Sequence, residues 1–183
     1  MLKESPPGRA SSLKAAPASL DRVNVRILRL LSAEPRLSMS ELARRVKMSP
    51  PAVTERVQRL EEAGVIAGYR LELDPAALGL PVAAYVRIRP APGQLRRVAQ
   101  VAEDAPEVVE CHRVTGEDCF IVKVQVSGLD GLEEVLDRFL AYGQTTSSIV
   151  QSTPVPLRAL PLPEGGPVDP GGRGRPHPGP ARP

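Results

Sequence analysis

The polar side chains between residues 44 and 59 are of the types that bind the backbone and the base edges of DNA. Arginine and lysine neutralise phosphates, so the basic cluster of Arg44, Arg45 and Lys47 is suited to a phosphate backbone. The residues after it carry hydroxyl, carboxylate, amide and guanidinium groups, which can bond to base edges in a groove. The candidate base-contacting face comprises Ser49, Ala52, Thr54, Glu55, Gln58 and Arg59.

The segment around these residues has the pattern of three short helices. Apolar residues recur at helical spacing in the first, at Leu20, Val23, Ile27, Leu30 and Leu31. Pro35 ends that helix, and Ser38 with Glu41 has the spacing of a capping box that opens the second. Ser49 as N-cap and Pro50 at the first helical position open the third, which Gly64 ends.

Two capped helices joined by a short turn describe a helix-turn-helix, whose second helix enters the major groove of DNA. The alternative is an ordinary three-helix core whose charged face is solvated, because spacing specifies the motif only weakly. We interpret Arg56, which lies between two buried valine positions, as a structural ion-pair partner and exclude it from the base contacts. Residues 65–73 are expected to lead out as an extended strand.

The second half of the chain alternates between strand and helix patterns. Strands are predicted over 82–89, 108–115, 119–126 and 147–155, and helices over 95–102 and 129–139. This order is that of a ferredoxin-like βαββαβ unit, with both helices on one face of an antiparallel sheet. Tyr85 and Ile121 fall on the other face, and we therefore expect a second subunit to cover it.

Composition divides the 183 residues into two domains and two tails. Residues 1–19 and 164–183 are rich in Pro, Gly, Ala and Ser and are predicted to be disordered. Residues 20–73 carry a net charge of +3 and residues 74–163 a net charge of −3, which suggests different partners. The sequence shows no zinc spacing, disulfide scaffold, secretory signal or membrane span, so we expect a soluble cytoplasmic protein.

The chain from about Leu20 to Pro163 resembles the Lrp/AsnC family, the leucine-responsive and asparagine regulators. The pieces that carry the resemblance are SPPAVTERVQRLEEAGVI, CHRVTGEDC and YGQTTSSIV. The fold implied is α+β: an N-terminal winged helix-turn-helix three-helix domain followed by a C-terminal ferredoxin-like βαββαβ domain for effector binding and oligomerisation. The helix-turn-helix segment of the family falls on residues 39–58.

The function that the resemblance implies is transcription regulation through double-stranded DNA, without enzymatic activity, metal or cofactor. Such regulators are homodimers that often assemble into octamers, and their effectors are small molecules, usually amino acids. The effector pocket is implied to lie at the turn after the second strand and at the segment before the fourth. On this sequence those positions are Thr115, Gly116, Glu117, Asp118, Thr145, Thr146 and Ser147.

Two other functions remain open at this stage. Haem-pathway decarboxylases, which act on tetrapyrroles, resemble the same two-domain architecture, but this chain has one histidine, His112, outside its tails. The other alternative is an amino-acid-binding module that no longer binds DNA, against which the retained basic residues argue. Cys111 and Cys119 flank one predicted hairpin and are interpreted as reduced thiols rather than a redox switch.

Overall fold

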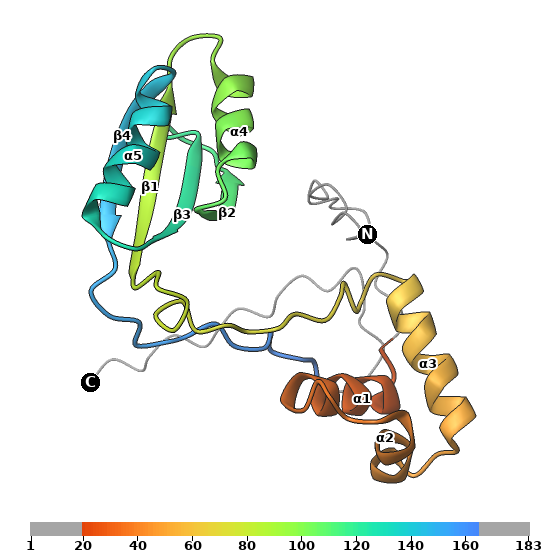
Figure 1. Cartoon of the computed structure of the whole chain (residues 1–183). Helices are drawn as coiled ribbons and strands as arrows, with labels where there is room; N and C mark the ends of the chain where they lie inside the picture. The colour runs from red at the N-terminus through yellow and green to blue at the C-terminus, as the bar shows by residue number, and fades with distance from the viewer. Residues whose placement is uncertain (1–19, 165–183) are drawn as a thin grey trace, which may run out of the picture. The chain divides into compact units, whose positions relative to one another are not determined.

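The computed structural model describes residues 20–164, and both predicted tails, apart from Glu164, lie outside this range (Figure 1). The described residues form two compact units. One contains the residues up to Arg70 together with those from Arg158 onward, and the other is Leu71–Leu157. None of the helices in the described range is long and apolar enough to cross a membrane.

The first unit contains α1 (Arg22–Ala33), α2 (Met39–Val46) and α3 (Pro50–Glu62). Side chains begin the first two helices: the Asp21 carboxylate accepts from the Asn24 N–H at 2.7 Å, and the Ser38 hydroxyl accepts from the Glu41 N–H at 3.2 Å. The third begins with Pro50, whose missing N–H costs nothing there. The three predicted helices are therefore confirmed.

A single apolar core holds these helices together. Its buried residues come from all three: Ile27, Leu28, Leu31, Leu42, Ala43, Val46, Val53, Val57 and Leu60. The chain returns to this core near its C-terminal end, where Leu162 packs against it and the Pro163 carbonyl accepts from Arg29 at 3.3 Å. Residues 158–164 thus complete the first unit.

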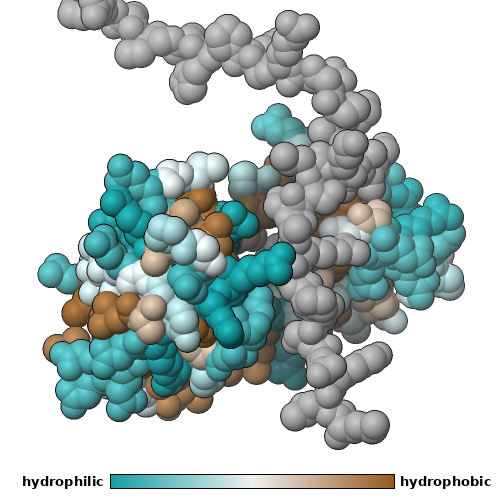
Figure 2. Space-filling view, turned by 90° about the horizontal axis from the view of Figure 1, so that it is seen from above, coloured by the Kyte–Doolittle hydropathy of each residue, from teal (hydrophilic) through white to brown (hydrophobic). Residues whose placement is uncertain are grey.

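The predicted strand over residues 65–73 is wrong. Val65 and Ile66 pack on the helical core, and the backbone from there to Pro81 forms turns and irregular segments without a ladder. A strand requires a hydrogen-bonded neighbour, and the first unit offers none to this segment. Tyr69, Leu71 and Leu73 consequently stay exposed. Figure 2 shows hydrophobic residues, in brown, among hydrophilic ones at the surface.

The second unit is a four-stranded antiparallel sheet with two helices. Along the chain these are β1 (Val82–Pro90), α4 (Leu95–Asp104), β2 (Val108–Arg113), β3 (Phe120–Val126), α5 (Leu129–Leu140) and β4 (Gly143–Ile149). The strand order is β2-β3-β1-β4, which confirms the ferredoxin-like unit. Both helices pack on one face, where Val98, Val135 and Phe139 contact the inward side chains of β1 and β3. Tyr85 and Ile121 lie on the other face.

The fourth strand starts four residues earlier than predicted, at Gly143 instead of Ser147. Gly143 reads in sequence as the end of the preceding helix, but its backbone pairs with Pro90 of β1. A side chain at this position would overlap the carbonyl oxygen of Arg89, so the close approach of the two strands requires glycine. Thr145, Thr146 and Ser147 therefore lie within β4, not before it.

Candidate functional sites

The corner between α2 and α3 is formed by Lys47, Met48 and Ser49. Lys47 ends α2 in the left-handed conformation, with φ 59° and ψ 47°, and is the only non-glycine residue of the described range with positive φ. Its backbone N–H still caps α2 through the carbonyls of Ala43 and Arg44. Lys47 is exposed, and no ion pair within residues 20–164 involves it. A cationic side chain at this tight corner is thus free to meet an anion.

The first turn of α3 has little capacity to bind a phosphate through its backbone. Pro50 and Pro51 both lack an N–H, and the Ser49 hydroxyl makes no capping bond. Helix N-termini usually offer several unpaired N–H groups to anions. The groups that this corner offers to an anion are therefore the Lys47 ammonium and the Ser49 hydroxyl.

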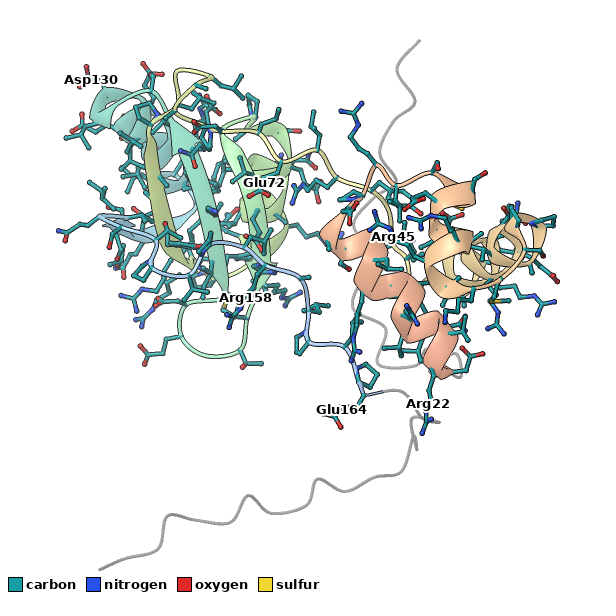
Figure 3. The ribbon with its side chains drawn as sticks, turned by 90° about the horizontal axis from the view of Figure 1, so that it is seen from below. Arg22, Arg45, Glu72, Asp130, Arg158 and Glu164 are labelled. Atoms are coloured by element: carbon teal, nitrogen blue, oxygen red, sulfur yellow. The ribbon has the colours of Figure 1, made fainter. Side chains whose placement is uncertain are left out.

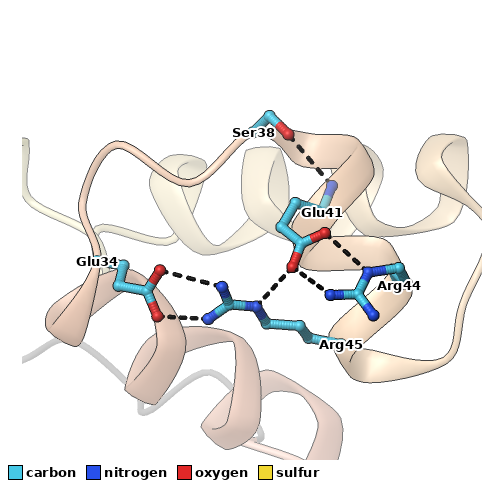
Figure 4. Close-up of polar contacts among 5 residues, drawn as sticks. All are labelled: Glu34, Ser38, Glu41, Arg44 and Arg45. Carbon is cyan, nitrogen blue, oxygen red and sulfur yellow. Dashed lines mark hydrogen bonds and ion pairs between the residues drawn. The ribbon is translucent and has the colours of Figure 1, made fainter.

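Arg44 and Arg45 belong to a network of carboxylates (Figure 4). Arg44 donates to both oxygens of Glu41, at 2.6 and 2.8 Å, and Arg45 Nε donates to Glu41 at 2.9 Å. Arg45 also forms a two-bond pair with Glu34 beyond the end of α1. These bonds lower the pKa of Glu41 to about 2, so Glu41 keeps its charge at all ordinary pH values. The predicted capping box is accordingly half formed, because Glu41 binds the arginines rather than the Ser38 N–H.

The exposed face of α3 carries the predicted base-contacting residues. The Arg59 guanidinium donates to the Glu55 carboxylate at 2.5 Å, and the Thr54 hydroxyl donates to the Pro50 carbonyl at 2.9 Å. Gln58 is exposed, whereas Ala52 is half-buried. These side chains lie on α3, and Ser49 is its N-cap, as the sequence predicted.

Arg56 is a structural residue, as its position predicts. Its Nη1 donates to the Asp21 carboxylate at 2.6 Å and to the Asn24 side chain at 2.9 Å. Asp21 is also the N-cap of α1, so one carboxylate joins the start of α1 to the middle of α3. The charged side chains of Figure 3 include Arg22, just after this cap.

In the second unit, a cluster of opposite charges lies on the open face of the sheet. Arg87 and Arg89 project from β1, and the turn after β2 places Glu117 and Asp118 beside them. Arg89 forms an ion pair with Glu117, and Asp118 lies 3.9 Å from Arg89 Nε and 3.7 Å from Arg87 Nη1. We name these four residues the charged cluster.

The charged cluster contains two residues of one predicted effector segment and shares a sheet face with one residue of the other. In register, Arg87 pairs with Thr146 of β4, so Thr146 shares the open face with the cluster. Thr145 and Ser147 pair with Ile88 and Val86, whose side chains face the helices, and they do not join the cluster. Thr115 and Gly116 are exposed in the turn itself. The sequence reading missed the two arginines, although strand alternation placed them on the exposed face.

The other reactive side chains of this unit are two thiols and one imidazole, and the Cys119 thiol lies beside the charged cluster, 3.9 Å from the Glu117 carbonyl oxygen. Cys111 pairs with Val122, whereas Cys119 faces Val114 three positions farther along, so the two thiols are not cross-strand neighbours. Burial and the nearby Glu103 raise the pKa of Cys111, which disfavours a reactive thiolate. His112 is exposed, and its ring lies 2.6 Å from the Glu110 carboxylate.

Comparison with known proteins matches both units. Residues 20–67 match a family described as winged helix-turn-helix DNA-binding, and residues 83–160 match the Lrp/AsnC ligand binding domain. The chain is 35% identical to the HTH-type transcriptional regulator LrpC of Bacillus subtilis, over 73% of this chain and 92% of that protein. It is 36% identical to the regulator LrpA of Mycobacterium tuberculosis, over 74% and 92%.

Solved structures of transcriptional regulators are similar to this chain in fold. The structure of B. subtilis LrpC gives a TM-score of 0.71 at 34% identity and covers 74% of this chain and 97% of that one. A transcriptional regulator from Neisseria meningitidis, solved as a complex with L-Met, gives 0.73 at 28% identity, over 78% and 97%. These relatives are transcriptional regulators and not enzymes, so the decarboxylase alternative has no support among them.

Proposed function

The chain belongs to the Lrp/AsnC family of DNA-binding transcriptional regulators with a ligand-binding domain, and on this premise we propose how its two units act. The first unit binds double-stranded DNA through α2 and α3. The second binds a small effector, an amino acid, that modulates this binding. The observation that carries the proposal is the exposed polar face of α3, which follows directly on the tight, cationic corner at Lys47.

In this proposal α3 enters the major groove and α2 lies against the backbone. The base-contacting set is Ser49, Ala52, Thr54, Glu55, Gln58 and Arg59, and the phosphate-contacting set is Arg44, Arg45 and Lys47. Arg45 already ties α2 to Glu34, so Lys47, which has no ion-pair partner in the described range, is the main phosphate anchor. Gln58 offers the paired amide donor and acceptor that an adenine edge accepts.

Lys47→Gly is expected to weaken binding to every DNA sequence by roughly tenfold and to reduce the salt slope by about 0.9. The same change should raise the free energy of unfolding by up to about 1 kcal/mol, because glycine adopts the left-handed conformation without strain. Fluorescence anisotropy over a salt series and thermal unfolding measure the two effects. Lys47→Arg, which keeps the charge, should retain the salt slope.

Gln58→Ala is expected to reduce affinity for the preferred sequence by roughly tenfold while affinity for random DNA stays unchanged. A base contact discriminates between sequences, whereas a phosphate contact does not. Binding to an operator and to its single-base variants measures this loss of preference. Identical effects of the Gln58 and Lys47 changes on both kinds of DNA would contradict the assigned roles.

The charged cluster has the chemistry that recognises a zwitterion. A guanidinium of Arg87 or Arg89 binds a carboxylate, and the carboxylates of Glu117 and Asp118 bind an ammonium group. A free amino acid carries both charges on one carbon, so it would exchange the internal ion pairs for its own. The similar regulator from N. meningitidis was solved as a complex with such a ligand, L-Met. Thr115, Gly116 and Thr146 form the remaining edge of this site, whereas Thr145 and Ser147 lie on the opposite face.

The open face of the sheet is also the proposed dimer interface. Tyr85 is 43% exposed there, and a second copy would cover it together with Ile121. A two-fold dimer presents two copies of α3 to paired half-sites, and assembly of dimers into octamers would multiply these pairs. Effector binding at the charged cluster on this face would shift the packing between subunits and hence the spacing of the DNA-binding units. Light scattering at micromolar concentration that reports a monomer would contradict this assembly.

One experiment tests the whole proposal: binding of the protein to DNA from its own upstream region, with and without each of the twenty amino acids. Sequence-preferring binding that one amino acid alters supports both halves. Sequence-preferring binding that none of the twenty amino acids alters contradicts only the proposed effector binding. Binding no better than to random DNA contradicts the DNA half and favours an amino-acid-binding module.

A further inference from the structure

Every arginine of α2 and α3 is already paired with a carboxylate of the first unit. The pairs are Arg44 with Glu41, Arg45 with Glu34 and Glu41, Arg56 with Asp21, and Arg59 with Glu55. A surface that binds DNA would gain affinity from unpaired guanidinium groups. In this chain a carboxylate competes with DNA phosphates for each of these arginines.

Three of these arginines, Arg44, Arg45 and Arg56, belong to ion pairs that hold elements or neighbouring side chains together. Arg45 and Arg56 join separate elements, and Glu41 of the Arg44 pair also holds Arg45. The pair of Glu55 and Arg59 joins two residues of one helix, and its side chains are 61% and 72% exposed. An exposed pair of this kind contributes little to folding. Because folding depends little on this pair, it can be exchanged on the proposed base-contacting face when α3 binds DNA.

The surroundings leave Arg59 free to exchange partners. Glu55 and Arg59 line an open hollow of about 590 Å³ beside α3, and the Asp21–Arg56 ion pair, which is already occupied, lines it too. On random DNA, a phosphate contact of Arg59 would replace one exposed ion pair by another, with little net gain. At an operator, a two-bond contact to guanine in the groove is stronger than either, so only the operator draws Arg59 from Glu55.

We propose that Glu55 is an internal counter-ion that withholds Arg59 from the phosphates of non-operator DNA and thereby raises sequence specificity. The role rests on the proposed DNA binding by α3. It replaces the base contact proposed above for the Glu55 carboxylate by a contribution to specificity through Arg59.

The test compares Glu55→Gln with the wild-type chain on an operator, selected by the wild type from random duplexes, and on a random duplex. Glutamine keeps the size of the side chain and removes its charge. Affinity for the random duplex should rise roughly threefold, with a salt slope steeper by about 0.9 because one more phosphate is neutralised. On the operator the slope should stay unchanged, because Arg59 is engaged there already, and specificity should fall.

Two controls separate this role from bulk charge. Glu62→Gln removes the same charge from α3 at a residue with no ion pair in the described range, and it should leave the salt slope on random DNA unchanged. In an Arg59→Ala background, Glu55→Gln should likewise leave the slope unchanged. Equal slope changes for both glutamates, or a change that persists without Arg59, overturn the counter-ion role.

The remaining outcomes are also decisive. Weaker operator binding by Glu55→Gln without a gain on random DNA means that the carboxylate itself reads a base, which overturns the proposal. If the wild type prefers the operator and Glu55→Gln leaves this specificity unchanged, only the counter-ion role is overturned. A wild type that prefers no DNA overturns the proposed function and this role with it.

Discussion

Gly143→Ala is expected to destabilise the second unit by about 3 kcal/mol. The added methyl group would overlap the Arg89 carbonyl oxygen and lie 2.9 Å from the Cα of Pro90. Both obstacles are backbone atoms of the central strand β1, so no side-chain rotation relieves the overlap. Hydrogen-exchange mass spectrometry of the full chain should show faster exchange in β1 and β4, because Gly143 opens their pairing.

A matched glycine provides the control. Gly131 lies in the first turn of α5, where an added Cβ would meet Val126 Cβ at 3.5 Å, an ordinary contact distance. Gly131→Ala should therefore leave stability unchanged or raise it by up to about 1 kcal/mol, because alanine favours the helix. Exchange in β1 and β4 that is equally slow in both variants would show that the strands tolerate a side chain at Gly143.

Arg89→Ala is expected to weaken effector binding by roughly thirtyfold, because a charge-assisted hydrogen bond to the ligand carboxylate is lost. Arg89 also anchors Glu117 and approaches Asp118, so its loss frees the turn that carries both acids. Calorimetry with the amino acid that alters DNA binding measures the change. Light scattering of the variant checks that the dimer persists, because the charged cluster lies on the proposed dimer face.

Arg96→Ala is the companion variant, because Arg96 is exposed on α4 and has no ion pair in the described range. It removes the same positive charge and should leave effector affinity unchanged. A loss of affinity equal to that of Arg89→Ala would mean that the cluster acts only through its overall charge, without direct contact to the ligand.

The helices of the first unit were predictable from sequence because their signals are local. Asp21 was not identified as a cap, but Ser38, Ser49 and Pro50 mark the starts of α2 and α3 within a few residues of the apolar stripes. Arg56 was predicted as an ion-pair partner from its position between buried valines. Its partner Asp21 lies 35 residues away, a pairing that no local pattern indicates.

The proposed effector site was less predictable because strand pairing assembles it. Arg89 meets Glu117 and Arg87 approaches Asp118 only when β1 packs beside β3, so no sequence window contains both charges. The start of β4 was misplaced for a related reason: Gly143 serves a close contact with β1, whereas in sequence it resembles a helix end. Residues 65–73 show the converse, an apolar alternation for which the unit provides no partner strand.

The return of residues 158–164 to the helical core has a consequence for domain exchange. The DNA-binding unit is discontinuous in sequence, since Leu162 and Pro163 reach it only after the whole second unit has been synthesised. A cassette of residues 20–70 transplanted onto another sensor would leave uncovered the part of its core that Leu162 packs against. A working chimera should instead insert the new sensor between Arg70 and Arg158, as a loop is inserted into a host protein.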